Sequence, residues 1–226
     1  LEVLKNSGIE IVNNNYESFE IKGNQKFKAG NYFSQGDYSQ VAFFLVAGAL
    51  GCDVTCTGLR ENSLQGDKKI LDILNKFGTN ISIEKNGIRV RKSNLKGIEI
   101  DASEIPDLVP VLSVAGAIAD GETLIYNAGR LKLKESDRLF SIKEMLIHLG
   151  VEVIMGEDFI KINGKKRFLG GEIDSFNDHR IVMSGAVATL NSDDEVVIKG
   201  CNAINKSYPE FFNDYFRIGG KGEYIE

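Results

Sequence analysis

Hydrophobic and polar positions recur along the chain with a period of about 70 residues. Three times, an aspartate precedes an apolar segment rich in small residues, and a short run of β-forming residues follows. The three aspartates are Asp37, Asp107 and Asp178, which lie 70 and 71 residues apart. Each apolar segment predicts a buried helix and each following run predicts a strand. The regular spacing predicts a chain built from a repeated unit.

A second pattern recurs with the same period. Amphipathic runs end at Gly8, Gly78 and Gly150, and alternating apolar residues follow each glycine. A glycine in this position is typical of a left-handed helix C-terminus, and the alternation predicts a two-stranded hairpin. The predicted unit is therefore helix, strand, helix and hairpin, with a further strand expected just before the first helix.

The repeat divides the chain unevenly. Residues 1–21 match only the second half of a unit, and a polar, glycine-containing stretch between Gly23 and Gln35 separates them from the rest. After the helix expected near Pro209 to Ile218, too few residues remain to form a hairpin. We therefore expect residues 1–35 to be the remnant of a first domain and residues 36–226 to form a second domain of three units, the last incomplete. The chain is expected to be truncated at its N-terminus.

Composition and charge narrow the class of protein. The chain is 42% hydrophobic and 26% charged, which is typical of a globular protein, and its net charge of −5 argues against nucleic-acid binding as the main task. Neither a membrane-spanning apolar stretch nor a signal-peptide pattern is found in the sequence. Three cysteines, an odd number, indicate a reducing, cytoplasmic location without a disulfide framework.

The cysteines are also the first candidates for a metal site. Cys52 and Cys56 lie four residues apart and could be joined by Cys201, but the spacing is not CxxC and no histidine is near. Buried thiols are the simpler interpretation. We therefore expect no metal site.

The densest charge cluster lies in the middle of the chain. Arg130, Lys132 and Lys134 alternate in a segment expected to be extended, which places them on one face before a helix capped by Ser136 or Asp137. A solvated strand edge is the simpler interpretation of this cluster. The functional interpretation gains weight because basic residues also stand near two other predicted helix starts.

At those other helix starts, His179 and Arg180 follow Asp178, and Lys206 precedes the last helix. Cations at helix N-termini on an acidic protein suggest a local pocket for phosphate or carboxylate groups. Asp107 and Asp178 could border such a pocket, whereas Asp37 is expected to be a simple N-cap. His179 either acts in catalysis or orients Arg180.

Six segments together carry a resemblance to a known family: Gly36 to Leu45, Asn62 to Asp67, Ile105 to Asp107, Leu133 to Leu139, Asn177 to Arg180 and Lys206 to Phe212. In this order, and over essentially the whole chain, they resemble the 5-enolpyruvylshikimate-3-phosphate synthase family. The departures are small: Tyr38 and Gln40 stand where the family has small residues, and Ile181-Val182 replace Met-Ala.

The resemblance implies an α+β fold, the inside-out α/β barrel of enolpyruvyl transferases, built from βαβαββ units in two domains. It implies that this chain corresponds to the C-terminal half of the family's proteins. In the family, the extreme N-terminus returns to complete the second domain, so a strand for the last unit is expected from outside this chain.

The resemblance also implies a reaction. The carboxyvinyl group of phosphoenolpyruvate moves to the 5-hydroxyl of shikimate 3-phosphate, phosphate is released, and the product leads to chorismate and the aromatic amino acids. No metal and no other cofactor is implied. The chain alone is expected to be inactive, because its partner in the reaction is the missing N-terminal half of the same protein.

The roles of individual residues are carried over from matching positions. Asp107 resembles the carboxylate that binds the shikimate hydroxyls and accepts the attacking hydroxyl's proton, and Glu135 resembles the acid and base at the methylene carbon. Lys134 resembles the lysine that bridges both substrates, and the cations that resemble ligands of phosphoenolpyruvate are Arg138, Arg180 and Lys206. His179 remains a further candidate. Two alternatives stay open: enolpyruvyl transfer to UDP-N-acetylglucosamine, and a non-catalytic repeat domain.

Overall fold

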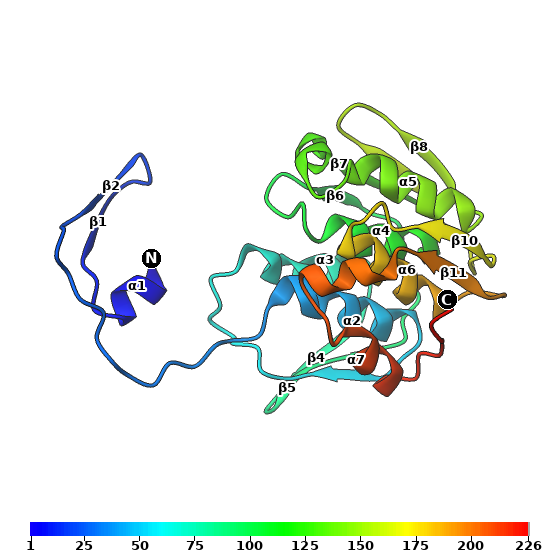
Figure 1. Cartoon of the computed structure of the whole chain (residues 1–226). Coiled ribbons are helices and arrows are strands. Elements are labelled where there is room, and N and C mark those ends of the chain that lie inside the picture. The colour runs from blue at the N-terminus through cyan, green and yellow to red at the C-terminus, as the bar shows by residue number, and fades with distance from the viewer. Residues whose placement is uncertain (226) are drawn as a thin grey trace. The chain divides into compact units, whose positions relative to one another are not determined.

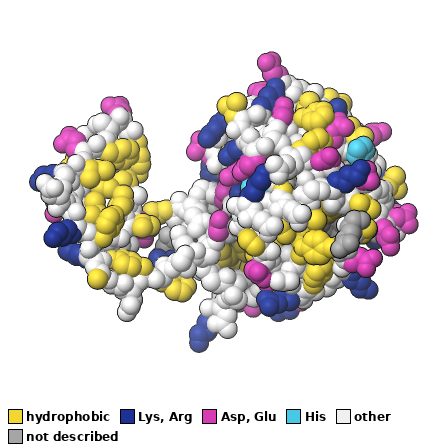
Figure 2. All heavy atoms as spheres, in the orientation of Figure 1, with side chains coloured by type: hydrophobic (Ala, Val, Ile, Leu, Met, Phe, Trp, Pro, Cys, Tyr) yellow, Lys and Arg dark blue, Asp and Glu magenta, His cyan; other side chains and the backbone are white. Residues whose placement is uncertain are grey.

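The computed structural model describes residues 1–225, which divide into two compact units joined near Gln35 and Gly36 (Figure 1). The first unit holds a short helix, α1 (Glu2–Asn6), and an antiparallel hairpin of β1 (Ile11–Asn14) and β2 (Ser18–Ile21). In this unit only Ile9 is buried, and hydrophobic side chains gather on one face of it (Figure 2). Residues 1–35 therefore have no hydrophobic core of their own.

The second unit contains three repeats. The first comprises α2 (Tyr38–Leu50), β3 (Val54–Cys56), η1 (Gly66–Lys69), α3 (Ile70–Lys76), β4 (Asn80–Glu84) and β5 (Gly87–Arg91). The second comprises β6 (Glu99–Asp101), α4 (Val109–Ile118), β7 (Glu122–Tyr126), η2 (Gly129–Leu133), α5 (Arg138–His148), β8 (Glu152–Met155) and β9 (Ile160–Asn163). The third comprises β10 (Gly171–Asp174), α6 (His179–Thr189), β11 (Val196–Lys199), η3 (Cys201–Lys206) and α7 (Phe211–Arg217).

Each repeat builds its own small sheet. The first has the strand order β3-β5-β4 and the second the order β6-β7-β9-β8, with an antiparallel hairpin in each. In the second and third repeats the strand before the buried helix pairs in parallel with the strand after it, with Ile100 opposite Ile125 and Ile173 opposite Ile198. Among the described residues, the third sheet consists of β10 and β11 only.

Three helices form the centre of the second unit. Helices α2, α4 and α6 are buried along nearly their whole length and pack against one another. Beyond their first turns these helices consist almost entirely of apolar and small residues, which is the expected composition of helices that are covered all round. Arg180, near the start of α6, donates hydrogen bonds to the main chain of Ser39 in α2 and of Asp107 just before α4. The N-terminal ends of the three central helices therefore meet.

The helix ends follow the sequence prediction. Gly8, Gly78 and Gly150 have φ angles of 80°, 87° and 77°. This is the left-handed region that glycine adopts without steric penalty. No helix among residues 1–225 combines the length and apolar character that crossing a membrane requires.

The prediction of an extended segment is wrong for residues 130–133. They lie in the 3₁₀ helix η2, in which Leu131 is fully buried whereas Leu133 is 86% exposed, and only Lys134, directly after the helix, has an extended backbone. The two leucines therefore do not share a face as they would in a strand. The turn begins where Leu131 N–H donates to the carbonyl of Ala128, and burial of Leu131 holds the turn against the core.

Candidate active site

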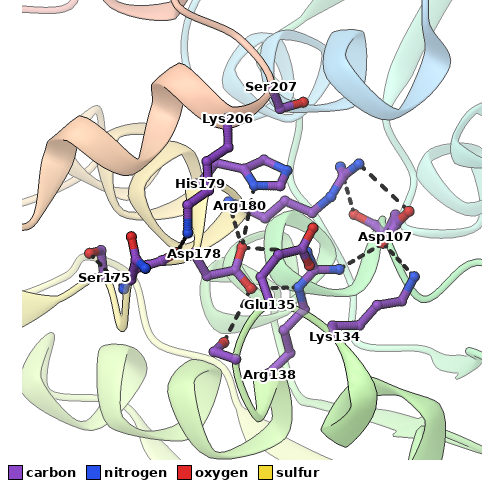
Figure 3. Close-up of polar contacts among 12 residues, drawn as sticks. Asp107, Lys134, Glu135, Arg138, Ser175, Asp178, His179, Arg180, Lys206 and Ser207 are labelled. Carbon is purple, nitrogen blue, oxygen red and sulfur yellow. Dashed lines mark hydrogen bonds and ion pairs between the residues drawn. The ribbon is translucent and has the colours of Figure 1, made fainter.

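Three cationic side chains point toward Asp107 (Figure 3). It precedes α4, and its carboxylate is one third exposed. Oδ1 accepts hydrogen bonds from Lys134 Nζ at 3.1 Å and Arg138 Nη1 at 2.6 Å, and Oδ2 lies 3.7 Å from Arg180 Nη2. Three cations from different parts of the second and third repeats therefore converge on one carboxylate.

Arg138 connects this carboxylate to two others. It is the first residue of α5, and its side chain is completely buried. Nε donates to Asp178 Oδ2 at 2.7 Å, Nη1 donates to Asp107, and Nη2 donates to Glu135. Burial alone would lower the pKa of Arg138, but its hydrogen bond and ion pair with Asp178 raise it, so the guanidinium stays charged.

Asp178 has two structural functions. Its buried carboxylate caps α6 by accepting the main-chain N–H of Arg180 at 2.9 Å, and it also accepts the Ser136 hydroxyl at 3.1 Å. Burial raises the pKa of Asp178, but the hydrogen bond and charge of Arg138 outweigh this effect and hold the pKa below its usual value. The Ser136 side chain therefore contacts Asp178 and does not cap α5. Asp137 is the N-cap of α5, because its carboxylate accepts the Phe140 main-chain N–H.

Arg180 and His179 lie in the first turn of α6 and are nearly buried. Arg180 Nη1 donates to the carbonyls of Ser39 and Asp107 at 3.3 and 3.1 Å, and Nη2 donates to the Ser39 hydroxyl at 3.0 Å. The pKa of His179 is lowered by burial and by the charge of Arg180, which favours the neutral imidazole. His179 Nδ1 lies 3.9 Å from Asp178 Oδ1 and, within residues 1–225, has no hydrogen-bond partner.

Lys206 reaches the same region from the end of η3. Its Nζ donates to the main-chain carbonyl of Asn177 at 2.5 Å, so the lysine is joined to the loop that leads into α6. The adjacent Ser207 accepts a hydrogen bond from Gln40 Nε2 in α2. Lys206 thus approaches from the side of Asp178 opposite the Asp107 cluster, as Figure 3 shows.

The charges around Asp107 control its protonation. Burial raises the pKa of this carboxyl, but the charge of Arg180 and the hydrogen bonds of Lys134 and Arg138 hold the pKa below its usual value. The neighbouring Asp67, in η1, behaves oppositely: burial and the negative charge of Asp107 raise its pKa. At neutral pH the ionised form of Asp107 is therefore the stabilised one.

All the residues singled out by the resemblance gather in this region. Asp107, Lys134, Glu135, Arg138 and Arg180 share one network of contacts, and His179 and Lys206 adjoin it through Asp178 and Asn177. Ser39 and Asp67 were not singled out, and Ser136 was considered only as a helix cap. The matching segments Gly36 to Leu45, Asn62 to Asp67 and Leu133 to Leu139, which contain these residues, carried the signal.

Other sequence candidates lie outside the network. Arg130 Nη1 donates to the carbonyl of Ser103, and the Lys132 side chain is exposed. The three cysteines are free thiols, and burial raises the pKa of Cys56 to about 12. Among the described residues, no group of three or more His, Cys, Asp and Glu side chains is arranged to hold a metal ion.

Comparisons with known proteins agree on one family. The family model for EPSP synthase (3-phosphoshikimate 1-carboxyvinyltransferase) matches residues 1–215. Curated proteins named 3-phosphoshikimate 1-carboxyvinyltransferase from Clostridium novyi (strain NT) and Clostridium acetobutylicum are each 49% identical to this chain over 220 residues. Both matches cover 97% of this chain and 51% of the relative, so the chain spans about half the length of the curated relatives it matches.

Solved structures agree with this result. An EPSP synthase from Acinetobacter baumannii superposes with a TM-score of 0.86 at 29% identity, covering 96% of this chain and 53% of that protein. The enolpyruvyl transferase NikO from Streptomyces tendae superposes with a TM-score of 0.75 at 18% identity, covering 97% of this chain and 52% of NikO, and shows the fold alone. The expected fold class, that of the enolpyruvyl transferases, is confirmed. The chain belongs to the EPSP synthase (3-phosphoshikimate 1-carboxyvinyltransferase) family.

Proposed function

We propose that the parent protein, meaning this chain together with the sequence that completes its relatives, transfers the carboxyvinyl group of phosphoenolpyruvate to the 5-hydroxyl of shikimate 3-phosphate and releases phosphate. This chain supplies the cationic side of the active site. The observation that carries the proposal is the convergence of Lys134, Arg138 and Arg180 on Asp107 in a member of this family.

The charges suit phosphoenolpyruvate. The substrate carries a carboxylate and a phosphate, so its binding needs several fixed cations. Arg180 offers a planar guanidinium held in place by main-chain carbonyls, and Lys134 and Lys206 offer ammonium groups on partly exposed and exposed side chains. Arg138 is fully paired and buried, so its part is to fix Asp107, Glu135 and Asp178 and to stabilise negative charge that develops nearby.

Two carboxylates perform the proton transfers. In the addition step the 5-hydroxyl oxygen bonds to C2 of phosphoenolpyruvate, Asp107 accepts the hydroxyl proton, and Glu135 donates a proton to the methylene carbon. In the elimination step Glu135 takes a proton back from that carbon while the C2–O bond to phosphate breaks, and the leaving phosphate takes up the proton that Asp107 holds. Bound substrate anions compete with Asp107 for the charges of Lys134 and Arg180, so the ionised form of Asp107 is stabilised less and Asp107 becomes a stronger base.

The rest of the parent protein supplies the other side of the site. Residues 1–35 bury only Ile9 and expose Val3, Val12 and Phe19, so we place them in a first domain completed by sequence outside this chain. Residues 36–226 form the second domain. Its third sheet has only β10 and β11 among the described residues, and the family resemblance assigns the missing strand to the parent's extreme N-terminus. Free thiols agree with a cytoplasmic location.

The two alternative functions are less well supported. The curated relatives are named for the shikimate reaction. The transferase that acts on UDP-N-acetylglucosamine lacks the segment that this chain has at Lys134-Glu135-Ser136-Asp137-Arg138. A repeat domain kept only for packing has no need for cations from separate elements around one partly exposed carboxylate. Both observations favour the transferase.

A titration of this chain with phosphoenolpyruvate tests the proposed site. We expect the chain to bind phosphoenolpyruvate and Lys206→Ala to weaken binding about tenfold, since one charge-assisted hydrogen bond is lost. Calorimetry measures both affinities. The control is Lys199→Ala, because Lys199 is an exposed lysine paired with Glu172 on β10, outside the network. Absence of binding, or equal affinity of wild type and Lys206→Ala, would contradict the proposed site.

A further inference from the structure

The orientation of Arg180 depends on the first turn of a helix far away in the sequence. Ser39, the second residue of α2, accepts two hydrogen bonds from the guanidinium: its hydroxyl from Nη2 at 3.0 Å and its carbonyl from Nη1 at 3.3 Å. Ser39 is 7% exposed and Arg180 6% exposed, so these contacts are shielded from water. A hydrogen bond to a charged group is stronger when water is excluded.

Arg180 has few other polar partners. Its Nη1 also donates to the Asp107 carbonyl at 3.1 Å, and its Nη2 lies 3.7 Å from the Asp107 carboxylate. Its Nε is buried and, within the described part of the chain, has no hydrogen-bond partner. Ser39 is therefore the side chain that holds Nη2 at hydrogen-bond distance, whereas the Asp107 carboxylate, 3.7 Å from Nη2, is one third exposed.

Two side chains fix the main chain at and just before Ser39. The Asp37 carboxylate accepts the Ser39 main-chain N–H at 2.7 Å, which is the N-cap of α2. Gln65, just before η1, spans the same turn: its Oε1 accepts Tyr38 N–H at 2.8 Å and its Nε2 donates to the Gly36 carbonyl at 2.9 Å. The amide of Gln65 thus fixes the main chain on both sides of Asp37.

We propose that Ser39 is a positioning residue for Arg180 in phosphoenolpyruvate binding, and that Gln65 acts through Ser39 by fixing the start of α2. This inference rests on the proposed function, because it assigns Arg180 to the substrate anion. The Ser39 hydroxyl accepts from Nη2 of Arg180 and its carbonyl accepts from Nη1, so the effect of Ser39 passes through the guanidinium.

Steady-state phosphate release by the parent protein tests this inference. We expect Ser39→Ala to raise KM for phosphoenolpyruvate roughly tenfold, because one buried hydrogen bond to a charged group is lost. The value of kcat is expected to change less than about threefold, since the binding lost is shared by ground and transition states. Gln65→Ala is expected to shift KM in the same direction, and Ser39→Thr, which keeps the hydroxyl, to restore wild-type KM.

The matched control is Ser113→Ala. Ser113 is a fully buried serine in α4 whose hydroxyl donates to its own helix at the Val109 carbonyl, so its loss does not touch Arg180. A wild-type parent that releases no phosphate overturns the proposed function and this inference with it. An active parent in which Ser39→Ala and Gln65→Ala keep the wild-type KM, or in which Ser113→Ala raises KM equally, overturns this inference alone.

Discussion

Replacing Arg138 with alanine is expected to lower the free energy of unfolding of this chain by about 3–5 kcal/mol. Arg138 is completely buried and donates to Asp107, Glu135 and Asp178. Its removal leaves the fully buried Asp178 carboxylate without its ion-pair partner, which is the costly way to break a buried pair. Urea denaturation at neutral pH measures the difference from wild type.

The control is Arg217→Ala, which also removes an arginine from an ion pair. Arg217 donates to Asp214 at 2.9 Å, but its side chain is 79% exposed. Exposed pairs contribute little, so a loss below about 1 kcal/mol is expected. If Arg138→Ala and Arg217→Ala destabilised the chain equally, the buried network would not have the importance assigned to it.

The destabilisation caused by Arg138→Ala is also expected to depend on pH. In wild type the pKa of Asp178 lies below its unfolded value, so the carboxylate contributes stability above the unfolded pKa, near 4, and this contribution is lost as pH falls. Without Arg138, burial raises the pKa of Asp178 above the unfolded value. Protonation of Asp178 at lower pH then removes the cost of burying an unpaired charge, and the variant is destabilised less. The difference between wild type and variant should therefore shrink from pH 7 toward pH 4, and a constant difference would contradict this assignment.

The second large effect is expected on turnover. Lys134→Ala and Glu135→Ala in the parent protein are each expected to lower kcat by about 10²–10⁴-fold, the range typical of lost acid–base catalysis or of a lost charge at the reacting centre. Both side chains are partly exposed, 26% for Lys134 and 39% for Glu135, so the fold should tolerate their removal. Phosphate release measures kcat, and thermal unfolding checks that each variant is folded.

The chain offers a nearby control for these variants. Lys132 lies in η2, two residues before Lys134, and its side chain is exposed. Lys132→Ala is expected to keep wild-type kcat within about twofold, since surface changes away from the site have small effects. Near-normal turnover by either Lys134→Ala or Glu135→Ala would show that the roles assigned to these residues are wrong.

The repeat could be predicted from sequence because its signals are local. The glycines that end the helices have φ angles that glycine favours, and the alternating residues after them form hairpins where the pattern predicted them. Residues 130–133 were predicted incorrectly because alternating charges cannot distinguish a strand from a 3₁₀ turn. Burial of Leu131 in the core decided between the two.

The contacts within the site could not be predicted in the same way. Arg138 and Asp178 lie 40 residues apart and Arg180 and Ser39 lie 141 apart, so only the packing of α5 and of α2 against α6 brings them together. Asp178 could be identified as an N-cap from its position, but its pairing with Arg138 depends on tertiary structure. Matching motifs located the cluster without showing which cation holds which carboxylate.

Phosphate release from phosphoenolpyruvate plus shikimate 3-phosphate tests the central claim most directly. It is measured with this chain alone and again after a separately made N-terminal half has been added. The proposed function predicts release only in the mixture, because a chain that spans about half of its relatives carries one side of the site. Turnover by this chain alone at the rate of an ordinary enzyme, or no release from two folded and associated halves, would contradict it.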